Sequence, residues 1–284
     1  MNPARRVPGR PVVAAVGDNT IDRYVGDEAV RFAGGNAFNV AAHLAHRGRP
    51  AAYFGAVGDD ANARTITRGL HRAGVDPVGL VTLAGRTAVT TIRVHAGERA
   101  FEREEFGVTA EYFPTRSQLD RLAEASWVHI GMLPRADELR AELRWRRTSR
   151  GDGPVVSQDC AVASGFRDLD VAVGSVGEDG DARGWARHAL DGGAQTVIVT
   201  RGAAGSVATD GRDWVAQPAL ATDVVDTTGA GDAFVAGFLD ARLDGLDCAL
   251  ALERGSRWAA AACRHRGGWP GAAGSSRLTD PSSG

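Results

Sequence analysis

Hydrophobic and polar positions along the chain alternate between short apolar runs and segments of helical period. The run PVVAAVG (residues 11–17) is continuously apolar and predicts a buried strand. The segment GGNAFNVAAHLAHRG (residues 34–48) has apolar residues at helical spacing between a glycine pair and a closing glycine, which predicts a helix. A strand at 51–58 and a helix at 61–73 repeat the order. This alternation indicates an α/β fold with a parallel sheet covered by helices on both faces.

Residues 86–106 change to a period of two. Ala88, Thr90, Ile92 and Val94 fall on one side, and more polar side chains fall on the other. The sequence HAGER supplies a turn, so the segment predicts a half-exposed hairpin. Within an α/β chain such a hairpin indicates a small lid sheet, and a peripheral hairpin without a role is the alternative.

The α/β alternation resumes after the hairpin. One domain is predicted over residues 12–270, with the lid hairpin inserted at about 86–106. Residues 1–11 and the Gly/Ser-rich residues 271–284 are predicted to be flexible tails. The further expected elements are strands at 127–130, 154–158, 171–173 and 196–200, a hairpin near 206–216, a strand ending at Val224-Val225, and helices at 136–147, 182–190, 231–243 and 247–264.

The charge balance narrows the class of protein. The 284 residues carry a formal net charge of −2, which offers no basic surface for nucleic acid and no polybasic segment for a membrane. No apolar stretch is long enough to span a bilayer, and three widely spaced cysteines indicate reduced thiols. A cytoplasmic location is therefore expected.

The chain contains no lysine, so all 33 of its Lys and Arg residues are arginines. A Walker P-loop and a protein-kinase site both require a lysine on the phosphates. Schiff-base catalysis also requires a lysine. These three chemistries are excluded.

The stretch DTTGAGDAFVAGF (residues 226–238) carries the most specific chemical signal. After the predicted strand, the Gly229-Ala230-Gly231 turn opens a helix, and a helix N-terminus with small residues binds anions through its free N–H groups. Asp232 follows the turn, where a carboxylate would receive a proton from an attacking hydroxyl. The helix dipole is expected to keep it ionised and hence a weak base. The alternative is a helix cap, and a dinucleotide fingerprint fails because Phe234 replaces its third glycine.

This stretch resembles the signature of the ribokinase/PfkB family of sugar kinases, and GGNAFNVA near the N-terminus is similar to the other signature of that family. The likeness covers residues 12–270, with the motifs in the order of the family. It implies a ribokinase-like α/β fold with a mostly parallel central sheet, helices on both faces and a small β lid. It also implies an ATP-dependent carbohydrate kinase that uses Mg²⁺ and K⁺.

The resemblance assigns roles to individual residues. Asp232 matches the catalytic base, and Gly229, Ala230 and Gly231 match the anion hole. The stretch TRGAAGS resembles the nucleotide segment of the family. The implied nucleotide contacts are Thr200, Gly202, Gly205, Thr228 and Gly231; the implied substrate contacts are Asp18, Asn19, Asp22, Gly34, Gly35, Asn36 and Asn39; the implied metal contacts are Glu178 for Mg²⁺ through water and Asp226 for a monovalent cation.

Two positions depart from the pattern of the family. Asn36 stands where ribokinase has a lysine, which argues against ribose, and Ser175 replaces the asparagine of the N-x-x-E motif that precedes Glu178. The GDN opening, the GGNAFNVA helix and the late GGW look most like the fructoselysine 6-kinase branch. The expected reaction is phosphorylation of a primary hydroxyl of a ketose-like substrate, such as 6-phosphorylation of a fructosamine.

Other functions stay open at this point. They are a kinase of fructose, ribose, 2-keto-3-deoxygluconate, a nucleoside or a vitamin, and a catalytically silent sugar-binding regulator. The intact Asp232 argues against the regulator. Because the exposed edge and apolar face of a lid sheet favour pairing, a homodimer through the lid is also expected.

Overall fold

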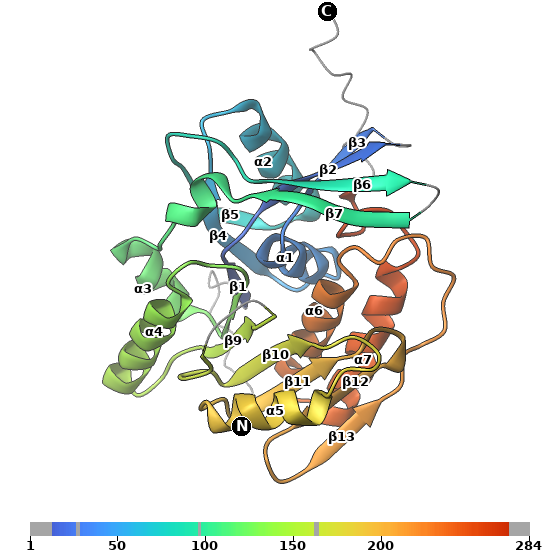
Figure 1. Cartoon of the computed structure of the whole chain (residues 1–284). Coiled ribbons are helices and arrows are strands. Elements are labelled where there is room, and N and C mark those ends of the chain that lie inside the picture. Colours follow the sequence, from blue (N-terminus) through green and yellow to red (C-terminus); the bar gives the residue numbers. More distant parts are fainter. Residues whose placement is uncertain (1–12, 27–28, 96–97, 162–164, 273–284) are drawn as a thin grey trace, which may run out of the picture.

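The computed structural model describes residues 13–26, 29–95, 98–161 and 165–272, which form two β-sheets with helices around the larger one (Figure 1). The larger sheet has the strand order β13-β12-β11-β10-β9-β8-β1-β4-β5. Its strands are β1 (Val13–Val16), β4 (Ala51–Val57), β5 (Asp76–Thr82), β8 (Trp127–Ile130), β9 (Val155–Asp159), β10 (Val171–Ser175), β11 (Thr196–Thr200), β12 (Ser206–Thr209) and β13 (Trp214–Gln217).

The large sheet is parallel from β5 to β11, and β12 and β13 extend it antiparallel at one edge. Successive residues of β1 enter different cores: Val13 and Ala15 join one, and Ala14 and Val16 join the other. Strands buried on both faces need apolar residues throughout, which explains the continuous apolar runs of the sequence. One face is covered by α1 (Asn36–His46), α2 (Ala61–Ala73), α6 (Ala230–Leu243) and α7 (Cys248–Ala262), and the other by α3 (Arg116–Glu124), α4 (Ala136–Arg150) and α5 (Ala182–Asp191).

The small sheet is the lid, and it has four strands in the order β3-β2-β6-β7. The predicted hairpin is confirmed as β6 (Val89–His95) and β7 (Glu98–Glu105). The other half of the lid, β2 (Thr20–Gly26) and β3 (Val30–Gly34), was not predicted as strand, because its apolar residues are few and interrupted by charges. Strand β2 pairs parallel with β6, so the segment next to the first motif joins the lid.

Most predicted elements are confirmed within two or three residues, but the strand expected to end at Val224-Val225 is wrong. Residues 218–225 form no helix or strand, and the side chains of Val224 and Val225 are 63% and 50% exposed. The helix expected after them is confirmed, because α6 begins at Ala230 with Gly229 as its N-cap. Residues 1–11 of the predicted tails lie outside the described ranges, as do 273–284.

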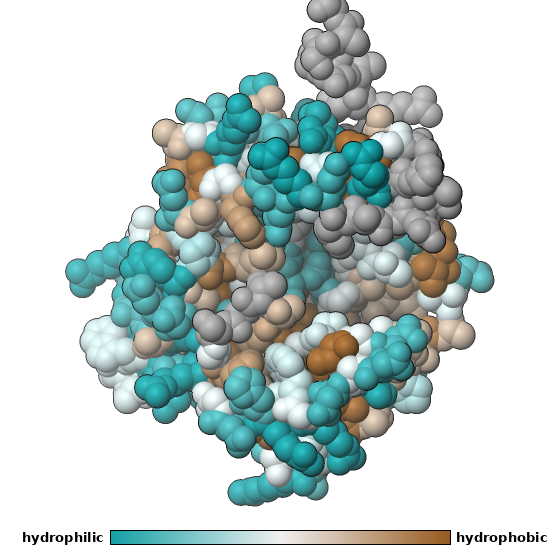
Figure 2. Space-filling view, in the orientation of Figure 1, coloured by the Kyte–Doolittle hydropathy of each residue, from teal (hydrophilic) through white to brown (hydrophobic). Residues whose placement is uncertain are grey.

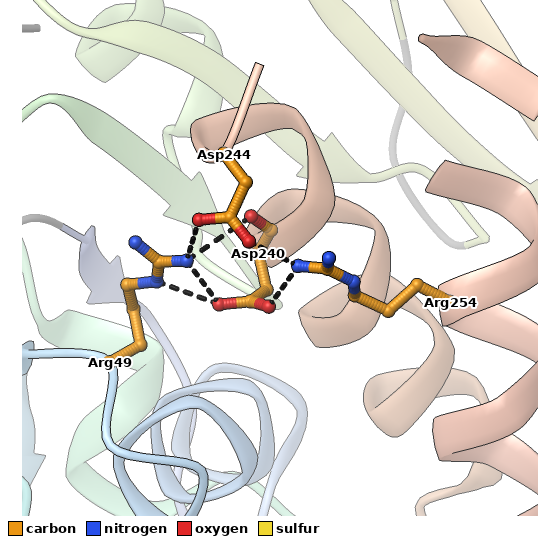
Figure 3. A network of polar contacts seen from close by, with 4 residues as sticks. All are labelled: Arg49, Asp240, Asp244 and Arg254. Atoms are coloured by element: carbon orange, nitrogen blue, oxygen red, sulfur yellow. Dashed lines mark hydrogen bonds and ion pairs between the residues drawn. The ribbon is translucent and has the colours of Figure 1, made fainter. Parts of the chain in front are cut away.

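A network of four charged side chains holds the C-terminal end of α6 (Figure 3). Arg49, from the turn before β4, contacts Asp240 at 2.7 Å and Asp244 at 2.6 Å. Arg254 of α7 contacts the same two carboxylates at 2.6 and 2.5 Å. The network therefore ties α6 both to the N-terminal half of the chain and to α7. No helix in the described ranges combines the length and apolar character needed to cross a membrane.

Candidate active site

The candidate site lies where the order of the large sheet changes direction. Strands β1 and β8 are neighbours, but the chain continues from β1 toward β4 and from β8 toward β9. The carboxyl ends of parallel strands at such a switch point border a crevice that binds ligands. Asp18 and Asn19 follow β1, Met132 follows β8, and Asp159 ends β9. The face of the molecule in Figure 2 is hollowed between the lid and the body.

The N-terminus of α6 presents unpaired backbone donors to this crevice. Within the described residues, the N–H groups of Gly229, Gly231 and Asp232 have no hydrogen-bond acceptor, and no side chain caps the helix. Gly229 has φ of 75°, and a Cβ there would lie 2.2 Å from the Gly268 carbonyl oxygen. A Cβ at Gly231 would meet nothing within 4 Å, so the backbone is open on that side. The helix start thus has the free donors that an anion site requires, and the binding of an anion there stays a prediction.

Asp232 is held by two asparagines of α1. Its Oδ1 accepts a hydrogen bond from Asn36 Nδ2 at 2.7 Å, and its Oδ2 accepts one from Asn39 Nδ2 at 2.7 Å. Burial is the largest cause that raises the pKa of Asp232 well above its usual value, and the nearby carboxylates of Asp159 and Asp18 raise it further. The hydrogen bonds from Asn39 and Asn36 lower the pKa in part. The expectation of a weak base is therefore wrong in direction, because burial and neighbouring carboxylates outweigh the helix dipole.

A buried chain of hydrogen bonds orients Asn36. Its Nδ2 also donates to Asp159 Oδ2 at 2.8 Å, and its Oδ1 lies 3.3 Å from His129 Nε2. His129 Nδ1 contacts Ser157 Oγ at 3.0 Å, and Trp127 Nε1 donates to the same hydroxyl at 2.8 Å. Burial lowers the pKa of His129 to about 3, so the ring is neutral. The hydroxyl of Ser157 can then donate to Nδ1 while Nε2 donates to Asn36, which directs the amide N–H groups of Asn36 to the carboxylates.

Asp18 and Asp22 occupy different surroundings. The Asp18 carboxylate accepts bonds from the backbone N–H groups of Asn36 at 2.6 Å, Met132 at 2.9 Å and Ala37 at 3.2 Å, which brace the start of α1. Burial raises its pKa to about 6 despite these bonds. Asp22 is 5% exposed, and no described residue donates a hydrogen bond to it. Burial, followed by the charges of nearby carboxylates, raises its pKa to about 8. Asp22 is thus an acceptor that lacks a donor.

The remaining predicted acceptor residues lie beside these carboxylates. A Cβ on Gly34 would meet Asp22 Oδ2 at 2.4 Å, and one on Gly35, whose φ is 109°, would meet Asn19 Cα at 2.7 Å. Asn19 donates to the hydroxyl of Tyr53 at 3.0 Å and to the carbonyl of Ala56 at 2.7 Å. The side chain of Asn19 therefore fixes the strand ends, and a direct role in substrate contact stays a prediction.

Asp226 organises the loop that precedes α6. It is 1% exposed and accepts bonds from the N–H groups of Thr228 and Gly267, both at 2.9 Å. Tyr24 of β2 contacts Asp226 Oδ2 at 3.5 Å and the Thr228 hydroxyl at 3.1 Å. This links the lid to the loop of the anion site. The predicted role of Asp226 in binding a monovalent cation stays a prediction.

The predicted nucleotide residues lie at the end of β11. Thr200 donates to the Gly174 carbonyl at 3.3 Å, and Gly202 and Gly205 have positive φ of 53° and 86°. A Cβ on Gly202 would lie 3.5 Å from Glu178, so the exposed Glu178 adjoins this segment. The described residues contain no group of three or more acidic, histidine or cysteine side chains able to hold a metal ion. A magnesium ion here would depend on Glu178, water and phosphate oxygens.

The structure brings the first and last motifs into contact, and it adds residues that the sequence did not single out. Asp159, His129 and Tyr24 are the additions. Asp159 is the first carboxylate after a predicted strand, so its place at a parallel strand end was a usable signal. His129 and Tyr24 gave no signal, because they act through partners that are distant along the chain.

Comparisons with known proteins identify the family and the fold. The model of the pfkB family carbohydrate kinases matches residues 19–270. A fructoselysine 6-kinase of Shigella flexneri is 31% identical over 265 residues, which are 90% of this chain and 99% of that protein. A fructosamine kinase of Bacillus subtilis is 27% identical and covers 88% of this chain and 89% of its own. A structure of Arabidopsis thaliana ribokinase with ribose and ATP superposes with a TM-score of 0.82 at 20% identity, covering 93% of this chain and 96% of its own.

Proposed function

We propose that this chain, which belongs to the pfkB family of carbohydrate kinases, transfers the γ-phosphoryl group of ATP to the primary hydroxyl of a fructosamine such as fructoselysine, at its 6-position. The observation that carries the proposal is the position of Asp232. Its carboxylate is held by Asn36 and Asn39 beside three free N–H groups at the start of α6. A proton acceptor and an anion site are thus adjacent, as transfer of a phosphoryl group to a hydroxyl requires.

Each group in the site has a separate role in the proposed phosphoryl transfer. The N–H groups of Gly229, Gly231 and Asp232 stabilise the charge on the transferring group, and Asp232 receives the proton of the attacking hydroxyl. Its raised pKa makes it a better proton acceptor than an ordinary carboxylate. Asp22, buried without a donor, accepts hydrogen bonds from sugar hydroxyls. Because the transition state of phosphoryl transfer is loose, positioning contributes more than basicity.

The nucleotide extends along Thr200, Gly202, Gly205 and Thr228 in this proposal. Glu178 is placed beside Gly202, where it would hold magnesium through water. Bound magnesium neutralises charge on the β- and γ-phosphates. Asp226 is assigned to a potassium site that supports the loop before α6.

The substrate is supported by two relatives, a fructoselysine 6-kinase and a fructosamine kinase. Asn36 supports it from the structure, because its side chain bridges two carboxylates where a lysine would carry a charge. We also propose a homodimer through the lid. The outer strand β7 presents exposed Glu102, Arg103, Glu104 and Glu105, so charge pairing would have to accompany any edge contact.

An ADP-release assay with Mg·ATP tests the proposal. Wild type and Asp232→Asn are compared on fructoselysine, fructose, ribose and 2-keto-3-deoxygluconate, each in KCl and in NaCl. We expect turnover on fructoselysine and at least a ~100-fold loss in Asp232→Asn, since positioned acid–base groups contribute about 10²–10⁴-fold. Turnover restricted to a plain sugar would reject the fructosamine. Equal rates in the two salts would reject the potassium site.

A further inference from the structure

A cavity of about 240 Å³ adjoins the proposed acceptor site. Its lining includes the apolar side chains of Phe106, Met132, Leu133 and Pro134. Asp159 is the charged residue among the described residues that line it. The volume is below the usual range for a whole ligand, about 300–1,000 Å³, so the cavity suits one substituent of a ligand.

Asp159 is also joined to the catalytic base through one shared donor. Asn36 Nδ2 lies 2.8 Å from Asp159 Oδ2 and 2.7 Å from Asp232 Oδ1. The second oxygen of Asp159 accepts a bond from the Ala161 N–H at 3.0 Å. The two carboxylates are thus separated by the width of a single amide group. A ligand as small as one sugar ring can reach both.

The acceptor site holds four carboxyl groups, and the described residues around it supply no positive charge to pair with them. Asp18, Asp22, Asp159 and Asp232 lie around it, and the hydrogen bonds donated to them come from backbone N–H groups and asparagine side chains, all neutral. No described arginine forms an ion pair with any of the four. The chain has no lysine to supply a charge elsewhere. Because Asp22 is buried without a donor, the site is also incomplete in hydrogen bonding.

We propose that Asp159 and this cavity form a subsite for the substituted ammonium group of the acceptor, with the carboxylate binding the cation and the cavity taking its hydrocarbon substituent. The inference rests on the proposed function and makes it more specific. With the primary hydroxyl at Asp232, the amine on the opposite exocyclic carbon of a ketofuranose reaches Asp159. A neutral sugar would leave that carboxylate without a counter-charge.

The apolar lining of the cavity also predicts which fructosamines bind best. An amine whose next carbons are methylenes presents only hydrocarbon to the cavity, as in Nε-fructosyl-lysine, and its charged head group can remain in solvent. An α-fructosylated amino acid places a carboxylate one carbon from the amine, next to Asp159. Like charges at that distance repel, and no basic residue is present in the described lining to offset them. The ε-linked and simple alkyl fructosamines are therefore the favoured class.

Steady-state kinetics with four acceptors test this subsite. They are Nε-fructosyl-lysine, 1-butylamino-1-deoxyfructose, Nα-fructosyl-glycine and fructose. Asp159→Asn is compared with wild type and with Asp191→Asn, which changes an exposed carboxylate at the end of α5. Losing a hydrogen bond to a charged group predicts a rise in KM of about 10- to 100-fold for the first two acceptors. Any effect that the substitution has through Asn36 and Asp232 should be shared by fructose, so KM should rise for the two fructosamines by this factor more than it does for fructose.

The outcomes separate the subsite from the proposed function. An equal rise in KM for fructose and for the two fructosamines would overturn the subsite, because Asp159 would then act only by positioning Asn36. A preference of the wild type for Nα-fructosyl-glycine would overturn it as well. If no fructosamine is turned over, the proposed substrate fails, and calorimetric titration of 1-butylamino-1-deoxyfructose decides the subsite. Binding that Asp159→Asn weakens would support the subsite, and no binding, or binding equal in both proteins, would reject it.

Discussion

Replacing Asn36 by alanine should move the pH dependence of the kinase. The side chain of Asn36 donates to Asp232 at 2.7 Å and separates it from Asp159, to which it donates at 2.8 Å. Both effects lower the pKa of Asp232 by favouring the carboxylate form. Without the amide, the base should hold its proton to a higher pH.

The size of the shift follows from the bonds that are lost. A hydrogen bond to a charged group contributes about 1.5–3 kcal/mol, and one pKa unit corresponds to about 1.4 kcal/mol. Asp232 keeps the bond from Asn39, and water can enter the space that alanine leaves. We therefore expect the lower end of this range, an upward shift of about one pH unit.

The measurement is kcat/KM against pH, which reports the ionisation of the free enzyme. Activity requires ionised Asp232, so it falls as the pH drops through the pKa of this group, and the acidic limb should move upward in Asn36→Ala. Asn39→Ala should move it in the same direction and further, since the Asn39 bond has the larger effect on the pKa of Asp232. Asn62→Ala, which removes an amide outside the site, should leave the profile in place. An unchanged or lowered acidic limb in Asn36→Ala would refute the assignment of Asp232 as the titrating base.

Two further predictions concern stability. The pKa of Asp22 is raised to about 8 in the folded state, so ionisation of this group lowers the stability of the folded protein as the pH rises from about 4 toward 8. Asp22→Asn should therefore melt higher than wild type at pH 8, by on the order of 5 °C, and the difference should be smaller at pH 5. Thermal denaturation followed by circular dichroism measures both. An equal difference at both pH values would contradict the raised pKa. Gly229→Ala should lower the melting temperature, because φ is 75° and its Cβ would lie 2.2 Å from a carbonyl oxygen, whereas Gly231→Ala, with nothing within 4 Å, should melt at or above wild type. Equal melting of the two alanine variants would show that the Gly229 turn is not strained by a side chain.

The sequence predicted the parts of the fold that local pattern encodes. The buried parallel strands and the glycine-bounded helices were readable because β1 and β4 are apolar throughout and Gly74 ends α2 in a left-handed conformation. Strands β2 and β3 were not predicted because charged residues interrupt the few apolar residues of TIDRYVG and VRFAG. Val224 and Val225 were misread because two exposed β-branched residues match the pattern of a strand.

Of the candidate site, too, the sequence revealed the parts that lie in contiguous motifs and missed those that depend on the fold. Asp232 and its glycine turn were identified from a contiguous motif; Asn36 and Asn39 were assigned to the substrate by resemblance, and their bonds to Asp232 were not predicted. His129 lies beside Ser157 on the paired strands β8 and β9, and spacing along the chain does not encode that; Asp159, at the end of a predicted strand, was the addition with a usable signal. The raised pKa of Asp232 could not be predicted either, since it depends on burial and on two carboxylates, Asp18 after β1 and Asp159 at the end of β9.

The network around the C-terminal end of α6 has a consequence for how phosphate is bound. The helix is fixed at that end by Arg49 and Arg254, and its first residue, Ala230, follows a glycine packed against Gly268. The start of the helix is therefore fixed before any ligand binds, and little conformational entropy would be lost there if it binds the anion of the proposed reaction. Binding of a phosphate at this helix would thus require no rearrangement of α6.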